Sequence, residues 1–255
     1  MDRLSRRYVK WVLELDIRTP NYIVIEETKV RELGMEAVKR AMKYEETARN
    51  SEKKIVLECW KEIDRRRKEE ENKWEKKRRE VMEKVGWSKV IRETMREFMR
   101  PEEIAEEMME KLEEERKEKR KRHIKESRYN EEYKDIRTEE RPGYLKGKRK
   151  KIERNRIARY RCGNEMRGSR YWREIEEREC RICKEGIEDW NHTLKECEET
   201  KDKIEIKELL EENGRGYKVI KKIEIAREKK RKEEEEGKRE TAEEEMKRKT
   251  EGRRK

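Results

Sequence analysis

Four residues in the last third of this 255-residue chain have the types and spacing of a metal site. They are Cys180, Cys183, His192 and Cys197, in the pattern C-x2-C-x8-H-x4-C. Two cysteines three residues apart can offer both thiolates to one ion, and the histidine and third cysteine complete a tetrahedral set. Zinc accepts sulfur and imidazole ligands without a geometric preference of its own. The spacing therefore predicts a zinc knuckle with zinc as its cofactor.

The segment between the ligands predicts how they are positioned. Asp189 can cap a helix that carries His192. His192 and Cys197 do not share one face of an α-helix, so the helix must end or unwind near Cys197. One other interpretation is unrelated cysteines in a charged sequence. The chief chemical rival is a redox CxxC, which would need a βαβ context that the sequence does not show.

The other cysteines and the second histidine have no ligand partners at metal-site spacing. Cys162 is expected to be a small packed residue, and Cys59, beside Trp60, a core residue. His123 stands in a run of lysine and arginine and is expected to be solvated.

A basic segment precedes the knuckle. Residues 141–173 contain 13 Lys/Arg and 2 Glu, a balance of +11 in a chain whose net charge is +12. Such a concentration indicates phosphate or another anionic partner, and interleaved aromatic side chains can stack on unpaired bases. The residues expected to contact nucleic acid are Arg154, Arg156, Arg159, Arg161, Arg167, Arg170, Arg173, Tyr160 and Tyr171. Trp172 and Trp190 are instead expected to fill the small core of the knuckle.

Composition predicts the elements that must hold these residues. Charged residues make up 55% of the chain and hydrophobic residues only 30%, with 11 Gly, 3 Pro and one Phe. So little apolar surface supports long solvated helices better than a large core or a sandwich. The expected fold is mainly α: extended charged helices, a small zinc-knuckle module near the C-terminus and a disordered tail.

Hydrophobic periodicity and helix-start signals divide the chain into four segments. Residues 1–50 hold short amphipathic helices, the first over 3–15 and the second capped by Thr19. Residues 51–140 hold long charged helices at 51–85 and 101–128. The segment 141–200 combines the basic residues, a short helix at 152–161 and the knuckle. The segment 201–255 is a charged tail with possible helices at 203–212 and from 217, disordered or transiently helical beyond Arg227.

The location of the protein is also constrained by the sequence. Five oddly spaced cysteines do not form a secreted disulfide framework. The first 16 residues lack the apolar region of a signal peptide, and no apolar run is long enough to cross a membrane. An intracellular protein, in nucleus or cytoplasm, is expected, with no membrane partner.

The residues around the knuckle resemble the region that follows the polymerase in reverse transcriptases of insect jockey-like non-LTR retrotransposons. Gly163-Asn164-Glu165 matches "GNE" in that family, Arg170-Tyr171-Trp172 matches "RYW", and the four metal ligands stand on its CCHC knuckle. Residues 4–29, 126–136 and 141–147 are similar to upstream parts of the region, so the resemblance spans roughly 2–200. Asp189 and Asn191 depart from the family pattern without removing a ligand. The resemblance implies that the knuckle helps to hold template nucleic acid.

Catalytic motifs of such elements are missing. The sequence contains no Asp-Asp pair, and two-metal phosphoryl transfer needs clustered carboxylates. We therefore expect a noncatalytic, retrotransposon-derived fragment that binds RNA or DNA, single-stranded or structured. One alternative is a helical interaction or scaffold protein whose long helices, with apolar stripes at 55–63 and 104–112, pair with each other or with a protein partner. Another is a decayed reading frame without a function.

Overall fold

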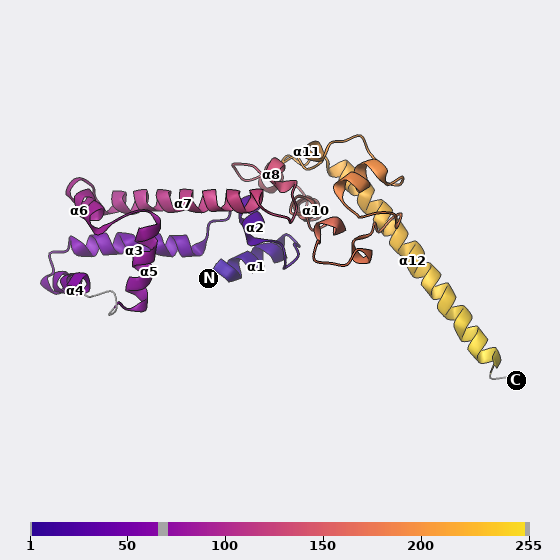
Figure 1. Cartoon of the computed structure of the whole chain (residues 1–255), viewed down its shortest axis with the longest axis horizontal. Coiled ribbons are helices and arrows are strands. Elements are labelled where there is room, and N and C mark those ends of the chain that lie inside the picture. Colours follow the sequence, from indigo (N-terminus) through magenta and orange to yellow (C-terminus); the bar gives the residue numbers. More distant parts are fainter. Residues whose placement is uncertain (1, 66–70, 253–255) are drawn as a thin grey trace. The chain divides into compact units, whose positions relative to one another are not determined.

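The computed structural model describes residues 2–65 and 71–252 (Figure 1). The described residues are helical or irregular and contain no strand. Their only β-type pairing is an isolated antiparallel bridge between Glu179 and Ile187. The expected mainly α class is confirmed.

The chain folds as two compact units. Unit 1 comprises residues up to Arg6 together with 30–123, and unit 2 comprises 7–29 together with the chain from Ile124 onward. The four segments expected from periodicity and helix-start signals remain a prediction.

Unit 1 is a helical unit with a core rich in methionine. Its elements are α3 (Leu33–Arg49), α4 (Lys54–Arg65), α5 (Lys73–Lys84), α6 (Lys89–Phe98) and most of α7 (Pro101–Lys125). The buried core residues are Met35, Met42, Met82, Trp87, Ile104, Ala105, Met108, Met109 and Leu112. Methionine has three rotatable bonds, so it fills irregular gaps between helices that offer few other apolar side chains.

The predicted helix from 51 to 85 is divided into α4 and α5. The Asn72 side chain accepts hydrogen bonds from the backbone N–H groups of Trp74 and Glu75, at 2.9 and 3.0 Å. The Glu75 carboxylate in turn accepts from the Asn72 N–H at 2.8 Å. This capping box begins a new helix, so the prediction of one continuous helix is wrong.

The stripe at 104–112 packs in the core of unit 1, in the same cluster as Met82 of α5. The expectation that Cys59 is a core residue is wrong. Cys59 is exposed rather than packed, because the α4 face that carries it points to solvent. His123 is exposed, as the sequence predicts.

Unit 2 holds the predicted site residues. It includes most of α1 (Asp2–Val12) and α2 (Asn21–Thr28). Its later elements are α8 (Tyr133–Ile136), α9 (Gly143–Lys146), α10 (Lys151–Arg161), the 3₁₀ turns η2 (Arg167–Ser169) and η3 (Glu176–Arg178), the π-turn η4 (His192–Glu196), α11 (Ile206–Leu209) and α12 (Tyr217–Gly252). The predicted helices at 152–161 and from 217 are thus present, and the one at 203–212 is a single turn. Thr19 does not cap α2, because its hydroxyl hydrogen-bonds Asn164.

The core of unit 2 combines aliphatic and aromatic side chains. Ile157 and Ala158 of α10 and Ile220 and Ile223 of α12 are buried, with Tyr133, Tyr144 and Tyr160 among them. Cys162 is fully buried in the same core, as predicted. The core therefore fixes α10 against the first turns of α12, and the knuckle lies between these two elements in sequence.

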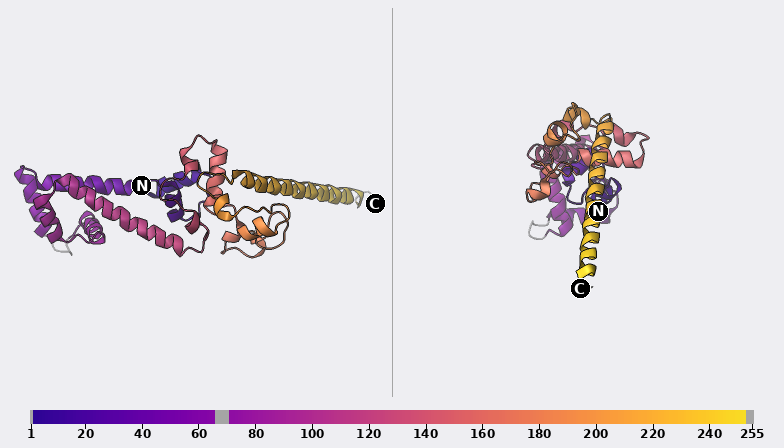
Figure 2. Two further views of the ribbon diagram at one scale, coloured as in Figure 1. Left: turned by 90° about the horizontal axis from the view of Figure 1, so that it is seen from above. Right: turned by 90° about the vertical axis from the view of Figure 1, so that its right-hand side faces the viewer.

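The second half of α12 extends past the other elements of unit 2 (Figure 2). The side chains of residues 231–246 are exposed. Ion pairs between side chains three or four residues apart stabilise this helix. Arg231, for example, pairs with Glu228 at 2.7 Å and with Glu235 at 2.7 Å. The sequence predicted either disorder or a transient helix beyond Arg227. In the structure this segment is helical up to Gly252. No helix of the described residues has the length and apolar character needed to cross a membrane.

Candidate functional site

The first two cysteines lie on a tight hairpin-like loop. The Cys180 N–H donates to the Gly186 carbonyl at 3.0 Å, and the Glu188 N–H donates to the Arg178 carbonyl at 2.8 Å. Lys184 and Gly186 have φ of 62° and 69°, so the chain turns back sharply after Cys183. The loop therefore brings Cys180 and Cys183 to one side of a short chain reversal.

The second pair of ligands lies on the π-turn η4. The Asp189 carboxylate accepts from the His192 N–H at 2.8 Å, which confirms the predicted cap. The Cys197 N–H then donates to the His192 carbonyl at 2.7 Å, the five-residue bond of a π-helix. In an α-helix, residues five apart lie roughly 140° apart around the axis. The wider π-turn removes this obstacle and places His192 and Cys197 close together.

The four predicted ligands converge. Their ligand atoms all lie within 4.8 Å of one another, and Cys183 Sγ lies 3.2 Å from His192 Nε2. Tetrahedral zinc with Zn–S bonds of about 2.3 Å would have sulfur atoms about 3.8 Å apart, so only small side-chain adjustments separate this arrangement from ligation. Cys180, Cys197 and His192 are buried, and Cys183 is partly exposed.

The surroundings of His192 suit a metal ligand. Nδ1 lies 3.3 Å from the Glu196 carboxylate, while Nε2 faces the cysteines. A carboxylate on one ring nitrogen fixes the orientation of a ligating histidine and makes the other nitrogen more basic. Gly186 lies against this ring, since a Cβ there would be 3.4 Å from Nδ1.

The electrostatics of the cluster favour a cation. Burial, together with the neighbouring Cys180 and Cys197, raises the pKa of Cys183 to about 11. The Cys183 thiol therefore resists ionising unless a positive charge joins the cluster, and a bound dication would supply that charge. The Cys3His cluster fits a metal ion such as zinc in donor type, number and spacing.

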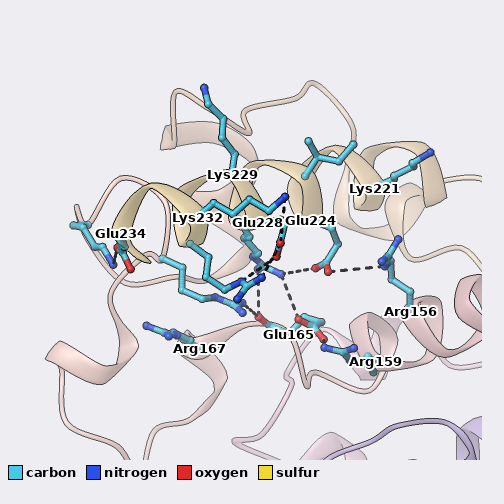
Figure 3. Close-up of a pocket in the computed structure, with 15 residues that line it drawn as sticks. Arg156, Arg159, Glu165, Arg167, Lys221, Glu224, Glu228, Lys229, Lys232 and Glu234 are labelled. Atoms are coloured by element: carbon cyan, nitrogen blue, oxygen red, sulfur yellow. Dashed lines mark hydrogen bonds and ion pairs between the residues drawn. The ribbon is translucent and has the colours of Figure 1, made fainter. Parts of the chain in front are cut away.

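A basic groove lies beside the knuckle in unit 2, with a volume of ≈ 850 Å³ (Figure 3). Ten of its fifteen lining residues are Lys or Arg and four are Glu. The cations come from three regions: Arg156, Arg159 and Arg167 in and after α10, Arg181 and Lys184 in the knuckle, and Lys221, Arg227, Lys229, Arg231 and Lys232 in α12. The groove thus carries a surplus of positive charge.

The groove contains three of the residues predicted to bind nucleic acid. Arg159 is paired with Glu165, and Arg156 lies 3.9 Å from Glu224. Arg167 is half-buried and has no ion pair within the described residues. Burial and the nearby guanidinium of Arg181 lower the pKa of Arg167. Arg167 therefore sits in a positive field that Glu188 only partly offsets.

Four other residues predicted to bind nucleic acid lie outside the groove. Arg154 and Arg170 are half-buried, and Arg170 donates to the Asn164 carbonyl at 3.3 Å. Arg173 pairs with Glu177 at 2.8 Å on the surface. Tyr171 is 49% exposed and borders Trp172. Each of the four has some exposed surface.

Tyr160 and Arg161 do not fit the prediction, because both are buried. The Arg161 guanidinium donates to Glu27 Oε1 at 2.5 Å and to the Ile136 carbonyl at 2.9 Å. This pair is fully enclosed. Burial opposes the charge of Arg161, yet the charge and hydrogen bond of Glu27 help to raise its pKa. Tyr160 donates to Glu224 at 2.6 Å, so both side chains serve the interior rather than a ligand.

The two tryptophans expected in the core of the knuckle behave differently. Trp190 is buried, as predicted, but it packs against Tyr160 in the main core of unit 2, with ring centroids 5.9 Å apart, rather than in the small cluster around the cysteines. Trp172 is 43% exposed, so the prediction for it is wrong. It stacks on Tyr129 rather than entering the core.

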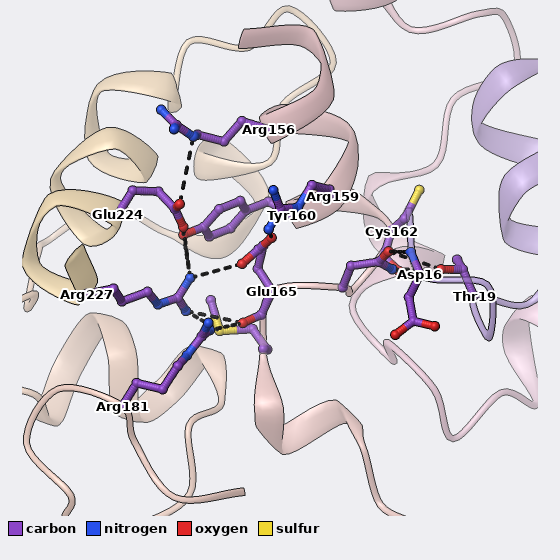
Figure 4. Close-up of polar contacts among 12 residues, drawn as sticks. Asp16, Thr19, Arg156, Arg159, Tyr160, Cys162, Glu165, Arg181, Glu224 and Arg227 are labelled. Atoms are coloured by element: carbon purple, nitrogen blue, oxygen red, sulfur yellow. Dashed lines mark hydrogen bonds and ion pairs between the residues drawn. The ribbon is translucent and has the colours of Figure 1, made fainter. Parts of the chain in front are cut away.

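A buried polar network joins the knuckle to α12, and Figure 4 shows the part of it in which Arg227 and Arg181 meet Glu165. Arg227 donates to Glu188 at 2.5 Å and lies 3.4 Å from Glu165. Arg181, which stands between the first two ligands in sequence, binds the same Glu188 through its Nε at 2.8 Å. The loop that presents the cysteines is thereby tied to one wall of the groove.

The "GNE" residues have identifiable structural roles. Gly163 has φ of 72°, and a Cβ there would lie 2.6 Å from Asn130 Cβ, so glycine is required. The Asn164 side chain accepts from the Asp16 N–H at 2.6 Å and donates to the Tyr129 hydroxyl at 3.0 Å. Glu165 pairs with Arg159 and Arg227.

Sequence reasoning missed the contribution of α12. Arg227 follows the buried Ile220 and Ile223 at positions i, i+3 and i+7, which places it on the same helix face. That periodicity predicts a buried, paired arginine at 227. No local sequence signal predicts that Glu27 is the partner of Arg161, because the two residues are 134 positions apart.

Comparisons with protein-family models, with curated proteins and with solved structures gave no match to this chain. The chain is a mainly helical protein with a Cys3His cluster that could bind a metal ion.

Proposed function

We propose that unit 2 is a noncatalytic nucleic-acid-binding module that zinc stabilises and that holds the phosphate backbone of RNA or DNA in the basic groove. The observation that carries this proposal is the positive surplus of the groove, whose lining includes a half-buried Arg167 without an ion-pair partner in the described chain. Phosphates are spaced along a strand, so a groove lined by many separate cations suits a polyanion.

The ion pairs of the groove separate structural cations from available ones. Arg227 and Arg181 are held by buried carboxylates, so they shape the groove. Lys221 is exposed, and Lys229 only approaches Glu233 at 4.0 Å. Together with Arg167, these two lysines are the cations best placed to bind phosphate.

The resemblance of residues 2–200 to the region behind the polymerase of jockey-like retrotransposons supports the same function and suggests the same origin. Zinc would be held by Cys180, Cys183, His192 and Cys197. Its part is structural: the metal closes the loop that carries Arg181, and Arg181 with Glu188 and Arg227 fixes the knuckle to α12. The lack of an Asp-Asp pair supports a binding role without catalysis.

A salt titration tests the proposal. The zinc-loaded full chain is titrated with a labelled 30-nucleotide single strand, as RNA and as DNA, at several salt concentrations. The triple variant Arg167→Gln, Lys221→Gln, Lys229→Gln should bind more weakly at low salt. The slope of log affinity against log salt should become shallower by about 0.7 for each phosphate that the variant no longer neutralises.

A matched variant controls for net charge. Arg40→Gln, Lys54→Gln, Lys76→Gln removes the same three charges from exposed positions of unit 1. It should keep the wild-type slope. Undetectable binding of wild type at low salt, or equal losses of affinity in the two triple variants, would remove the proposal.

A second candidate function, association with a protein partner through helices, is favoured by one observation. Tyr8 and Trp11 of α1 are 62% and 73% exposed and lie with ring centroids 5.9 Å apart. An exposed aromatic pair on a helix can anchor a partner. Light scattering of wild type and of Trp11→Glu would detect self-association, and an unchanged monomer in both would argue against that form of it.

A further inference from the structure

An aromatic platform stands on the surface of unit 2, outside the groove residues. Trp172 stacks on Tyr129 with ring centroids 6.0 Å apart and an interplanar angle of 17°. Tyr171 meets Trp172 edge-on, at 5.2 Å and 84°. Tyr129 is buried, whereas Trp172 and Tyr171 are each almost half exposed. The indole therefore has one face supported by the protein and keeps a large area open to solvent.

The platform is held rigidly from below. The Tyr129 hydroxyl accepts a hydrogen bond from the Asn164 amide at 3.0 Å, and Asn164 is also bound by Asp16 and Thr19. The hydrogen bonds fix the Tyr129 ring, and this ordered ring supports one face of the Trp172 indole. A pre-ordered aromatic surface loses little conformational freedom when a ligand stacks on it.

The charge around the platform matches a nucleic acid. The Arg128 guanidinium lies over the Tyr171 ring, 5.2 Å from its centroid. Arg170 and Arg173 flank the aromatic pair in sequence. An exposed aromatic surface bordered by arginines can stack bases while cations meet the adjoining phosphates.

We propose that Trp172, supported by Tyr129 and bordered by Tyr171, is a stacking site for an unpaired nucleobase and makes the protein prefer single strands to duplexes. This inference rests on the proposed nucleic-acid function and adds its substrate class. In a duplex, the base faces are covered by neighbouring bases and are not available to the indole. The groove binds phosphates of either form, so discrimination between them comes from the platform.

Binding to three probes tests the platform: a mixed-sequence single strand, its duplex, and a single strand of equal length whose central nucleotides are abasic. Wild type should bind the intact single strand more tightly than the other two. Trp172→Leu should weaken binding to the intact strand about 5- to 150-fold, the range for loss of one base–aromatic stack. Its affinities for the duplex and the abasic strand should stay near those of wild type.

Two controls keep structural damage apart from the loss of stacking. Trp172→Phe retains an aromatic face and should recover most of the preference for single strands. Circular dichroism and the Tm of each variant must match those of wild type. Equal weakening towards all three probes, or wild-type binding of single strand and duplex with the same affinity, would overturn the inference. Such a result would leave the groove proposal standing, which fails only if no nucleic acid binds at low salt or if the two triple variants lose affinity equally.

Discussion

The two units bury charge in different ways. In unit 1, Glu45 and Glu46 are buried beneath the partly accessible guanidiniums of Arg49, Arg78 and Arg96 and the buried guanidinium of Arg92, over a methionine-rich core. In unit 2, Arg161 and Glu27 are fully enclosed, and the Tyr133 and Tyr144 hydroxyls donate to the same carboxylate at 2.9 and 2.7 Å.

This difference indicates which unit depends more on precise side-chain positions in its interior. Flexible methionines and accessible ion pairs tolerate small shifts between helices. An enclosed ion pair with several defined donors does not, because any displacement leaves a charge without its partner. Unit 2 therefore has the more strictly specified interior, and it is the unit that carries the metal cluster and the groove.

The largest expected contrast comes from breaking one ion pair in each unit. Arg161→Met leaves Glu27 enclosed and unpaired, so the free energy of unfolding should fall by about 3–5 kcal/mol. Arg96→Met breaks the pair with Glu46, whose bonds are 2.6 and 2.8 Å, but Arg96 is partly exposed and water can replace it. The loss of stability should be about 1–3 kcal/mol. Denaturant unfolding measures both, and a larger loss from Arg96→Met would reverse the contrast.

A pH dependence should follow from Glu224 of unit 2. Burial opposes its ionisation, yet the Tyr160 hydrogen bond and the charges of Arg227 and Arg156 lower the pKa of Glu224. Because the folded-state pKa lies below the unfolded value of about 4.3, its stabilisation is complete above that pH and lost as pH falls through the folded-state pKa. Glu224→Gln should cost about 1–3 kcal/mol at neutral pH.

Urea titrations of wild type and Glu224→Gln from pH 7 downward would measure this difference. The difference in free energy of unfolding between wild type and variant should be constant above about pH 5 and shrink in more acidic solution. Glu115→Gln, an exposed carboxylate of α7, serves as the unit 1 control and should show little difference at any pH. A constant gap for Glu224→Gln down to about pH 2 would contradict the assignment.

The smallest effects compare two cysteines outside the metal cluster. Cys162 is fully buried in unit 2, and burial raises the pKa of its thiol. Cys162→Ser places a hydroxyl in an apolar site and should cost about 1–3 kcal/mol. Cys59→Ser changes an exposed residue of unit 1 and should alter stability by less than about 0.5 kcal/mol. Thermal unfolding of the two variants measures both losses of stability. Similar losses would contradict the buried position of Cys162 and the exposed position of Cys59.

Local signals in the sequence predicted much of the fold. The start of α7 at Pro101, the end of α10 at Arg161 and the cap of His192 by Asp189 all follow from neighbouring residues. The capping box at Asn72 was equally readable, and the uninterrupted charged pattern around it concealed the break.

The metal ligands could be predicted because their spacing is local, and the structure adds the π-turn that reconciles His192 with Cys197. The roles of Arg161 and Arg227 could not be read from charge alone. Both belong to arginine-rich sequence, yet partners far along the chain, Glu27 and Glu188, draw them into the interior. A basic segment thus mixes structural and available cations, and only the fold separates them.

Thiol counting combined with zinc release tests most directly the central claim, that a metal organises unit 2. In protein purified without chelator, one of the five thiols, Cys59, should react rapidly with a thiol reagent. A chelator should release one zinc per chain and expose three more thiols, while Cys162 should react only on unfolding. Rapid reaction of Cys180, Cys183 and Cys197 in the untreated protein, without any zinc release, would contradict the account.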